Sequence, residues 1–319
     1  MKKVFFYILL TCSLLSVEIV LHAQTIDKQT YTFAVKGGDT LRMDKYVAVN
    51  SMKDTLPKPV VLFAFGGGFK GGERDNPIFD SYFKFLVQNG FVVVSTDYRT
   101  GLKDVDKSKV ADLAGFSSAL YHAIGMAVED YFDATDFIVR HSVDWQIDPA
   151  RIIACGSSAG AVTTLQAEYE ICNRTALTDR LPENFNYAGV IAFAGAICAE
   201  GTPQWKNMPC PIMFFHGDAD TIVPFTEAVL GDRGLWGSNF ISKQLKEKGS
   251  PYYFYIVEGV GHKMASLPMR NNHQDILSFL NRLVLGKQKL CVTTVEATPG
   301  QPAYKTDFTT EDYIRENMR

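Results

Sequence analysis

Ser158 is the residue of this chain most clearly placed to do chemistry. It is the centre of Gly156-Ser-Ser-Ala-Gly160, which follows the short apolar run Arg151–Cys155 and precedes a helix-compatible run from Ala161. Small residues around a serine allow a tight strand-to-helix turn that holds the serine in a strained conformation, with its hydroxyl exposed. The start of the following helix favours negative charge near that hydroxyl. The pattern predicts a nucleophile, with a structural turn as the alternative, because such five-residue matches also arise by chance.

A serine nucleophile needs a base, and in this chemistry the base is a histidine. After residue 23 the chain has five histidines. His262 follows Glu258-Gly-Val-Gly261 in a flexible loop just after a predicted strand, which gives it the freedom to face Ser158. Two of the others lie in helical segments before Ser158, one ends a strand and one begins the last helix; these are His122, His141, His216 and His273. Elimination therefore favours His262 as the base.

The third partner is a carboxylate that orients the base. The segment His216-Gly-Asp-Ala-Asp220-Thr-Ile-Val-Pro224 follows a predicted strand and lies between Ser158 and His262, which suits the chain order Ser, Asp, His. The segment holds two carboxylates, Asp218 and Asp220. Aspartate in such a loop is often a turn or cap residue. The spacing favours Asp220 and leaves Asp218 open.

Three consecutive glycines follow the apolar run Pro59–Phe65. Gly66, Gly67 and Gly68 let the backbone approach a ligand and turn its amides inward. The amides of Gly67 and Gly68, with that of Ala159, are the candidate donors to a tetrahedral oxyanion, and each such donor is typically worth ~3 to 4 kcal/mol of barrier. The alternatives are a flexible turn and a phosphate loop, and the second lacks the Gly-Lys-Ser/Thr that should follow.

The rest of the chain alternates apolar runs with stretches of helical period. Continuous apolar runs bounded by turn residues are typical of parallel strands that are buried on both faces. The expected strands are Pro59–Phe65, Phe91–Asp97, Arg151–Cys155, Gly189–Ala194, Pro211–Phe215 and Tyr252–Val257, after a hairpin of Thr30–Val35 and Leu41–Val49; Ala127–Arg140 and Asp275–Val284 are expected helices. The alternation predicts an α/β fold, a doubly wound and mostly parallel sheet flanked by helices.

The first 23 residues have the composition of a secretory signal peptide. Lys2 and Lys3 precede an apolar run, and Leu21-His-Ala23 ends in a small residue suited to cleavage before Gln24. Glu18 departs from that pattern, and an uncleaved anchor is the alternative. No later segment approaches the ~20 apolar residues that a membrane span requires. The expected location is therefore secreted or periplasmic, with no stable membrane insertion.

Two other segments stand outside the strand and helix alternation. Residues 103–121 are too long for a plain connection and are a candidate cap element over the site. Residues 287–319 are expected to form a C-terminal tail that packs on, or trails from, a catalytic domain of residues 24–286.

Composition excludes several classes of partner. The chain has 32 basic and 35 acidic residues, a net charge of −3, and no basic cluster stands out, so nucleic acid is not an expected partner. No Cys-x-x-Cys or His-Glu-x-x-His pattern occurs, so we expect no metal and no cofactor. The oligomeric state is left open by the sequence.

The cysteines leave disulfide pairing open. Five follow the signal segment: Cys155, Cys172, Cys198, Cys210 and Cys291. In an exported protein one or two disulfides could form, with one thiol left over. Cys198 and Cys210 are near enough in sequence to bridge, whereas Cys155 is simply a small buried hydrophobe in its strand.

The motifs together resemble the α/β-hydrolase superfamily, and most of all esterases of the hormone-sensitive-lipase and carboxylesterase groups. The resemblance covers roughly residues 55–285. It is carried by four motifs in the family order: Gly66-Gly-Gly68 as the oxyanion segment, Asp97-Tyr-Arg99 after the next strand, the Gly156–Gly160 elbow, and His216-Gly-x-x-Asp220-x-x-Val-Pro224 as the acid loop. This likeness, rather than spacing, assigns Asp220.

The chain departs from that family pattern at two positions. Phe65 stands where the family usually has a histidine that braces the oxyanion loop, which puts that loop's hydrogen bonding in question. Ser157 stands where aspartate is commoner, which should alter the local electrostatics only modestly.

The resemblance implies a secreted serine esterase that works through an acyl-enzyme, with Ser158 as nucleophile, His262 as base and Asp220 orienting the imidazole. Its expected substrates are small-molecule or carbohydrate esters, either acetyl or feruloyl esters of plant polysaccharides or short-chain carboxylic esters in general. The alternatives are a serine peptidase of the same fold and a non-catalytic hydrolase-fold protein that binds a partner or a lipid.

Overall fold

The computed structural model describes residues 25–49, 56–106, 112–300 and 309–317, so the expected signal peptide lies outside the described residues. The strands of the large sheet are β1 (Ile26–Lys36), β2 (Asp39–Ala48), β3 (Lys58–Ala64), β4 (Val92–Thr96), β5 (Ile147–Ser157), β6 (Gly189–Phe193), β8 (Ile212–Gly217), β11 (Tyr252–Val257) and β12 (Cys291–Glu296). Their order across the sheet is β1-β2-β4-β3-β5-β6-β8-β11-β12. β1 pairs antiparallel with β2, and β2 with β4, while every pair from β4 to β12 is parallel.

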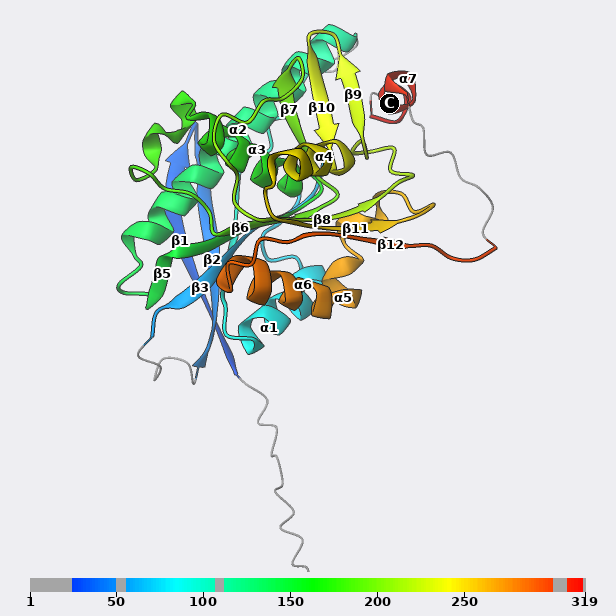
Figure 1. Cartoon of the computed structure of the whole chain (residues 1–319). Coiled ribbons are helices and arrows are strands. Elements are labelled where there is room, and N and C mark those ends of the chain that lie inside the picture. Colours follow the sequence, from blue (N-terminus) through cyan, green and yellow to red (C-terminus); the bar gives the residue numbers. More distant parts are fainter. Residues whose placement is uncertain (1–24, 50–55, 107–111, 301–308, 318–319) are drawn as a thin grey trace, which may run out of the picture.

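Helices cover both faces of this sheet (Figure 1). On one face lie α2 (Leu113–Arg140), α3 (Ala159–Asn173) and α4 (Ser238–Lys248), and on the other lie α1 (Asp80–Gln88), α5 (Pro268–Asn271) and α6 (His273–Phe279). Short helical turns are η2 (Pro77–Phe79), η4 (Ala176–Arg180) and η5 (His262–Ala265), and α6 continues as the π-helix η6 (Leu280–Leu285). The predicted doubly wound, mostly parallel α/β fold is confirmed.

The central strands are continuously apolar because helices bury both of their faces. The side chains from Val60 to Ala64 of β3 are fully buried, and so are those from Ile152 to Cys155 of β5. The Phe63 ring meets the rings of Phe79 and Phe83 at centroid distances of 4.7 and 5.1 Å. Each large side chain buried in this way contributes roughly 2 kcal/mol. The hairpin and each strand predicted from an apolar run are present.

A second, three-stranded antiparallel sheet was not expected from the sequence. It consists of β7 (Ala196–Glu200), β10 (Arg233–Gly237) and β9 (Glu227–Leu230), in the order β7-β10-β9. These strands have four or five residues each. So short a segment carries too little periodicity to separate a strand from a loop. The small sheet packs on α3 through β7 and stands beside the upper half of α2 (Figure 1).

Residues 103–121, which were expected to form a cap element, do not form one within the described residues. Residues 107–111 lie outside the described residues, and residues 113–121 are the first turns of α2 rather than a separate element. Asp112 begins the helix by accepting a hydrogen bond from the amide of Gly115 at 2.7 Å. The buried side chains of Phe116 and Leu120 then continue the apolar face found further along the helix. Within the described residues, this stretch is therefore helix and not a cap.

The C-terminal residues contribute two regular elements that the sequence analysis did not predict. β12 adds a parallel edge strand to β11, and the helix α7 (Thr310–Asn317) packs against β9 (Figure 1). The side chains of β12 alternate between exposed and half-buried, as befits an edge strand that lacks a partner on one side. A run of that kind lacks the continuous apolar character used to predict the central strands.

The five cysteines after the signal segment are all free thiols in the described chain. Cys198 lies in β7 and Cys210 precedes β8, and both are buried without bonding to each other. The bridge that the sequence left open between them is therefore not formed. Among the described residues, no helix combines the length and the apolar character needed to cross a bilayer.

Candidate active site

Ser158 sits at the sharp turn between β5 and α3. Its backbone has φ 52° and ψ −119°, a conformation that side-chain-bearing residues rarely adopt and that costs about 1–3 kcal/mol. The turn needs its glycines: a Cβ on Gly156 would lie 2.2 Å from the Gly160 carbonyl oxygen, and one on Gly160 would lie 2.1 Å from the Ala64 carbonyl oxygen. The predicted strained elbow is confirmed, and it presents a half-exposed Ser158 at the start of α3.

The hydroxyl of Ser158 meets the ring of His262. Ser158 Oγ lies 2.7 Å from His262 Nε2, and His262 Nδ1 lies 2.8 Å from Asp220 Oδ2. A carboxylate at Nδ1 favours the tautomer with its proton on that nitrogen, so Nε2 is left to accept the proton of the Ser158 hydroxyl. The structure thus brings together the three side chains that the sequence singled out.

Within the described residues, the other four histidines form no hydrogen bond with Ser158. His141 Nδ1 lies 2.7 Å from the Phe137 carbonyl oxygen, and His273 Nε2 lies 2.8 Å from that of Met269. His122 is exposed on α2, and His216 is buried on β8. Only His262 of these five contacts Ser158. It begins the short 3-10 helix η5 rather than lying in an open loop.

Asp220 is held in one orientation by its own loop. It is 1% exposed. Its Oδ1 accepts hydrogen bonds from the amides of Ile222 and Val223 at 2.9 and 3.1 Å, which leaves Oδ2 for His262. Burial opposes ionisation of Asp220, but the hydrogen bonds of His216 and His262 outweigh it and hold the pKa of this carboxyl well below its usual value. The carboxylate is therefore ionised at neutral pH.

Asp218 has a different task from Asp220. Its Oδ1 accepts a hydrogen bond of 2.6 Å from the amide of Gly259, in the loop that leads to His262. The Ala219 amide donates to the Val260 carbonyl oxygen at 3.2 Å. Asp218 therefore joins the acid loop to the histidine loop, which is the turn-bracing role that the sequence had left open for it.

The three loops meet because their strands end at the same edge of the sheet. β5, β8 and β11 are parallel and close together in the sheet order, so the residues that follow their carboxyl ends converge. Close contact between two of the loops requires Gly217, because a Cβ there would lie 1.8 Å from the Val260 carbonyl oxygen. The residue after His216 is thus glycine for a steric reason.

The glycine segment runs directly beside Ser158. A Cβ on Gly66 would lie 3.1 Å from the Cβ of Ser158. Gly67 and Gly68 have φ of 137° and 62°, which are backbone conformations suited to glycine. Within the described residues, none of the amides of Gly67, Gly68 and Ala159 donates a hydrogen bond to another part of the protein. These three donors remain available to a ligand beside Ser158.

Phe65 shows how the loop is braced without the family's histidine. Its ring stacks on Tyr98 at a centroid distance of 4.4 Å, and the Tyr98 hydroxyl donates a 2.7 Å hydrogen bond to the Phe65 carbonyl oxygen. The flanking residues of Asp97-Tyr98-Arg99 are also structural. Asp97 pairs with Arg74 at 3.0 Å, and Arg99 pairs with Asp130 at 2.8 Å. An aromatic stack and one carbonyl bond therefore take the place of a polar brace.

Asp220 has a second histidine neighbour, which was not predicted from the sequence. His216 is fully buried, and its Nε2 lies 3.4 Å from Asp220 Oδ2 and 3.2 Å from the Val223 carbonyl oxygen. Its Nδ1 lies 2.8 Å from the hydroxyl of Ser238, at the start of α4. The signal was present in the His-Gly-x-x-Asp spacing. A strand-terminal histidine nevertheless gives no indication of which loop its ring will face.

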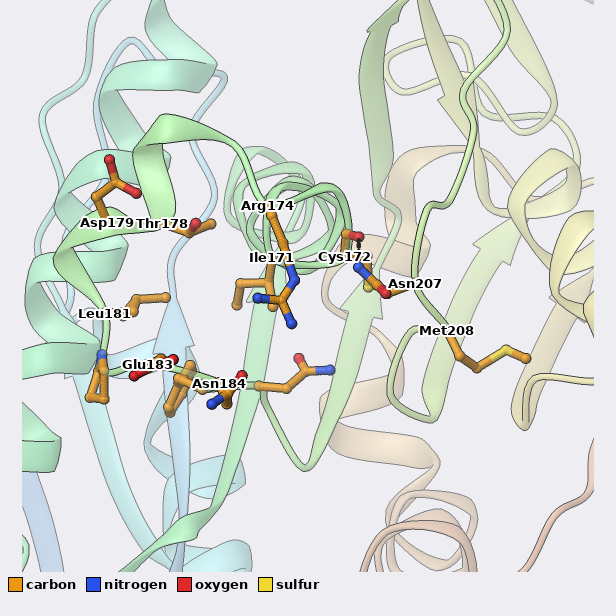
Figure 2. A pocket seen from close by; sticks show the side chains of 13 residues that line it. Ile171, Cys172, Arg174, Thr178, Asp179, Leu181, Glu183, Asn184, Asn207 and Met208 are labelled. Carbon is orange, nitrogen blue, oxygen red and sulfur yellow. Dashed lines mark hydrogen bonds between the residues drawn. The ribbon is translucent and has the colours of Figure 1, made fainter.

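Two cavities formed by the described residues lie away from Ser158. One of about 550 Å³ surrounds the C-terminal end of α3, where Ile171, Arg174, Asn184 and Met208 line it (Figure 2). Since α3 has 15 residues, this cavity is about 20 Å from the helix start that carries Ser158. Another, of about 500 Å³, lies between α2 and α3. Neither contains Ser158, His262 or Asp220 among its lining residues.

Comparisons with known proteins support the fold described above. Residues 43–197 match the model of the family described as BD-FAE. No curated protein matches the sequence. The fold is similar to that of Thermogutta terrifontis esterase 2 phosphoramylated by tabun, with a TM-score of 0.59 and 18% identity over 80% of this chain and 94% of that one.

Two further structures from the same source have short acids bound. The propionate-bound form of Est2 gives a TM-score of 0.57 at 18% identity, over 80% of this chain and 94% of that one. The butyrate-bound form gives 0.57 at 17% identity, over 82% and 95%. At such identities the likeness establishes the fold, and the match of residues 43–197 covers the segment with the elbow and the glycine run. The chain therefore has the α/β-hydrolase fold, and its residues 43–197 are similar to BD-FAE.

Proposed function

We propose that this chain hydrolyses carboxylic esters through an acyl-enzyme formed on Ser158. The proposal rests on two hydrogen bonds that join the three side chains in sequence. Ser158 Oγ lies 2.7 Å from His262 Nε2, and His262 Nδ1 lies 2.8 Å from Asp220 Oδ2. This hydrogen-bonded series ends at a strained elbow beside unengaged amides, which is the arrangement that acyl transfer requires.

The reaction follows from these positions. Ser158 Oγ attacks the ester carbonyl carbon while His262 Nε2 takes the hydroxyl proton. When the tetrahedral intermediate collapses, the carbon–oxygen bond to the alcohol breaks and Nε2 returns the proton to the leaving oxygen. Water then attacks the acyl carbon as Nε2 accepts its proton, and the acid leaves as Ser158 regains that proton.

The other groups of the site stabilise the charges that develop during the reaction. Ionised Asp220 stabilises the imidazolium that forms twice in each cycle and keeps the ring oriented. The amides of Gly67, Gly68 and Ala159 are the donors proposed for the oxyanion, and each is worth ~3 to 4 kcal/mol when it is aimed at the developing charge. The helix α3 adds the positive end of its dipole at the same point.

The proposed substrates are esters of short-chain acids or acyl esters of polysaccharides. The match to BD-FAE supports an ester substrate, and the Thermogutta terrifontis esterase was solved with propionate and with butyrate bound. Acetyl or feruloyl esters of polysaccharides and general short-chain esters are therefore the classes to compare. For residues 1–23 we propose export with cleavage after Ala23, which N-terminal sequencing of the exported protein would establish by a start at Gln24.

The decisive experiment removes the nucleophile. Ser158→Ala should lower the hydrolysis of p-nitrophenyl acetate by at least about 10³-fold and abolish covalent labelling by a fluorophosphonate probe. Ser118→Ala, a change of an exposed serine on α2, is the matched control and should leave both unchanged. Undiminished turnover in Ser158→Ala would overturn the proposal, and an unlabelled wild-type protein would favour a non-catalytic binding protein.

A comparison of kcat/KM among substrates then distinguishes the possible substrate classes. We expect kcat/KM to be highest for p-nitrophenyl esters of two to four carbons, with acetylated xylan and methyl ferulate tested alongside. A greater kcat/KM for a peptide anilide than for any ester would instead assign the chain to the serine peptidases.

A further inference from the structure

The C-terminal helix α7 lies against the acid loop, although almost a hundred residues separate them in the sequence. The side-chain amide of Asn317 donates a hydrogen bond of 3.2 Å to the carbonyl oxygen of Thr221, the residue next to Asp220. At the other end of the helix, the Val229 amide of β9 donates to Thr310 Oγ1 at 3.1 Å. Figure 1 shows α7 beside β9, and the residues of the two elements are in contact. Both ends of the helix are thus attached to the chain that follows Asp220.

Between these attachments, Tyr313 is inserted into the protein. It is 6% exposed, although it belongs to an eight-residue helix at the end of the chain. Tyr313 stands one helical turn before Asn317, whose side-chain amide also donates a 2.9 Å hydrogen bond to the Tyr313 carbonyl oxygen, so both side chains lie on the face of α7 that reaches the acid loop. Burial raises the pKa of the Tyr313 phenol. Its hydroxyl forms no hydrogen bond within the described residues. Packing, rather than a polar bond, therefore holds this buried ring on the side of α7 that faces the acid loop.

The surroundings of Asp220 come from three elements. His216 faces it from β8 and His262 from η5, and α7 reaches the adjacent Thr221 through Asn317. The charged side chains of α7 are occupied elsewhere or exposed: Asp312 pairs with Arg315, while Glu311 and Glu316 are exposed. The buried side chain that the helix presents on the side of the acid loop is therefore a neutral aromatic ring.

A neutral ring at this position has a specific consequence. It neither pairs with the carboxylate nor repels it, but it excludes water that would otherwise solvate Asp220. Ionic interactions weaken when water reaches them, because the local dielectric rises. Excluding water therefore strengthens the attraction between Asp220 and the imidazolium that forms on His262 during the reaction.

We propose that Tyr313 and Asn317 are positioning residues for the reaction, through which α7 fixes the acid loop and keeps water away from Asp220. The inference rests on the proposed esterase function and deepens it. It gives the C-terminal segment a role in the site, since the helix is tied to the residue next to Asp220.

Four variants test this role. Tyr313→Ala should lower kcat for p-nitrophenyl acetate about 10-fold with KM within about twofold, because it removes support for the transition state alone. Tyr313→Phe keeps the ring and should recover most of that loss. Asn317→Ala should lower kcat about threefold. Glu311→Ala, a change of an exposed residue on the same helix, is the matched control and should match the wild type.

A pH profile separates positioning from a general loss of structure. With Asp220 more hydrated, the imidazolium is less stabilised, so the acidic limb of the kcat profile should move to lower pH in Tyr313→Ala and Asn317→Ala. A merely structural role would lower the amount of active protein, measured by fluorophosphonate titration, without moving that limb. If Tyr313→Ala fails to fold, Asn317→Ala, whose side chain is only half-buried, still decides the question.

The outcomes are distinct. An active wild-type protein whose Asn317→Ala variant has the kcat and acidic limb of Glu311→Ala would overturn this inference alone. A wild-type protein that reacts with neither ester nor probe would overturn the proposed function and, with it, this role of α7.

Discussion

The hydroxyl of Ser157 donates a hydrogen bond of 2.7 Å to the carbonyl oxygen of Ala265. Ser157 immediately precedes the nucleophile, and Ala265 ends the 3-10 helix that begins with His262. This one bond ties the strand that presents Ser158 to the segment that presents its base. An aspartate, the commoner residue at this position in the family that the sequence resembles, would carry acceptor oxygens to that carbonyl and could not donate to it when ionised.

Removing the Ser157 hydroxyl should loosen the pairing of nucleophile and base. We expect Ser157→Ala to lower kcat for p-nitrophenyl acetate about 10-fold with little change in KM, because small displacements of reacting groups are costly in rate. Ser242→Ala is a matched control: this buried serine on α4 donates its hydrogen bond to the Asn239 carbonyl oxygen within its own helix. Equal kcat values for the two variants would show that the bond to Ala265 does not position His262.

Asp220→Asn should lower kcat by about 10³- to 10⁴-fold. The amide oxygen of the new side chain would take over the hydrogen bonds from Ile222 and Val223, which leaves its NH₂ group facing His262 Nδ1. The imidazole would then carry its proton on Nε2 and could not accept one from Ser158. Steady-state kinetics at neutral pH provide the measurement, and a loss smaller than 10-fold would mean that the carboxylate charge and tautomer control contribute little.

Gly160→Ala should destabilise the fold by roughly 3 kcal/mol or more, because the new methyl group would lie 2.1 Å from the Ala64 carbonyl oxygen, and backbone cannot yield. Gly125→Ala is the control. A Cβ at Gly125 in α2 meets nothing within 4 Å, and alanine in a helix is favoured over glycine by up to ~1 kcal/mol. Urea denaturation of both variants gives the comparison, and similar midpoints would contradict the close packing of the elbow.

Glu168 should make stability depend on pH. Burial raises the pKa of this α3 carboxyl from its ordinary 4.5 to about 7, although hydrogen bonds from Cys210 and Cys172 oppose the rise. The folded protein therefore holds the proton more tightly than the unfolded chain. Its contribution to stability is full below about pH 4.5 and is lost as the pH rises to about 7, a difference of roughly 3 kcal/mol.

The Glu168→Gln variant has no titratable group at this position. Its NH₂ group would replace the oxygen Oε2, which has no hydrogen-bond partner in the described protein. We expect the free energy of unfolding of the variant, relative to wild type, to rise between pH 5 and pH 8. Glu183→Gln, at an exposed position, should show no such change. Parallel pH dependence of wild type and Glu168→Gln in urea denaturation would contradict a raised pKa.

Much of the scaffold was predictable because its signals are local. The apolar runs of β3, β5 and β8 are long enough to identify buried strands, and the order of glycines around Ser158 specifies a tight turn through sterics alone. β7, β9 and β10 have too few residues for such a signal, and each becomes a strand only because the others pair with it. Residues 113–121 were wrongly assigned to a cap element for a related reason. They begin the helix α2, whose helical pattern is clear in the sequence only in its later turns.

The sequence by itself determined that Ser158 occupies a strained elbow, that His262 was the histidine free to reach it, and that glycines precede the site. These properties depend on the sizes and conformations of adjacent residues. Tertiary structure alone decided that Asp218 bonds to Gly259 while Asp220 meets two histidines, and that α7 lies on the acid loop. Such contacts join residues about 40 to 100 positions apart, or depend on how a loop closes, and they form only when the parallel strands bring their carboxyl ends to one edge of the sheet.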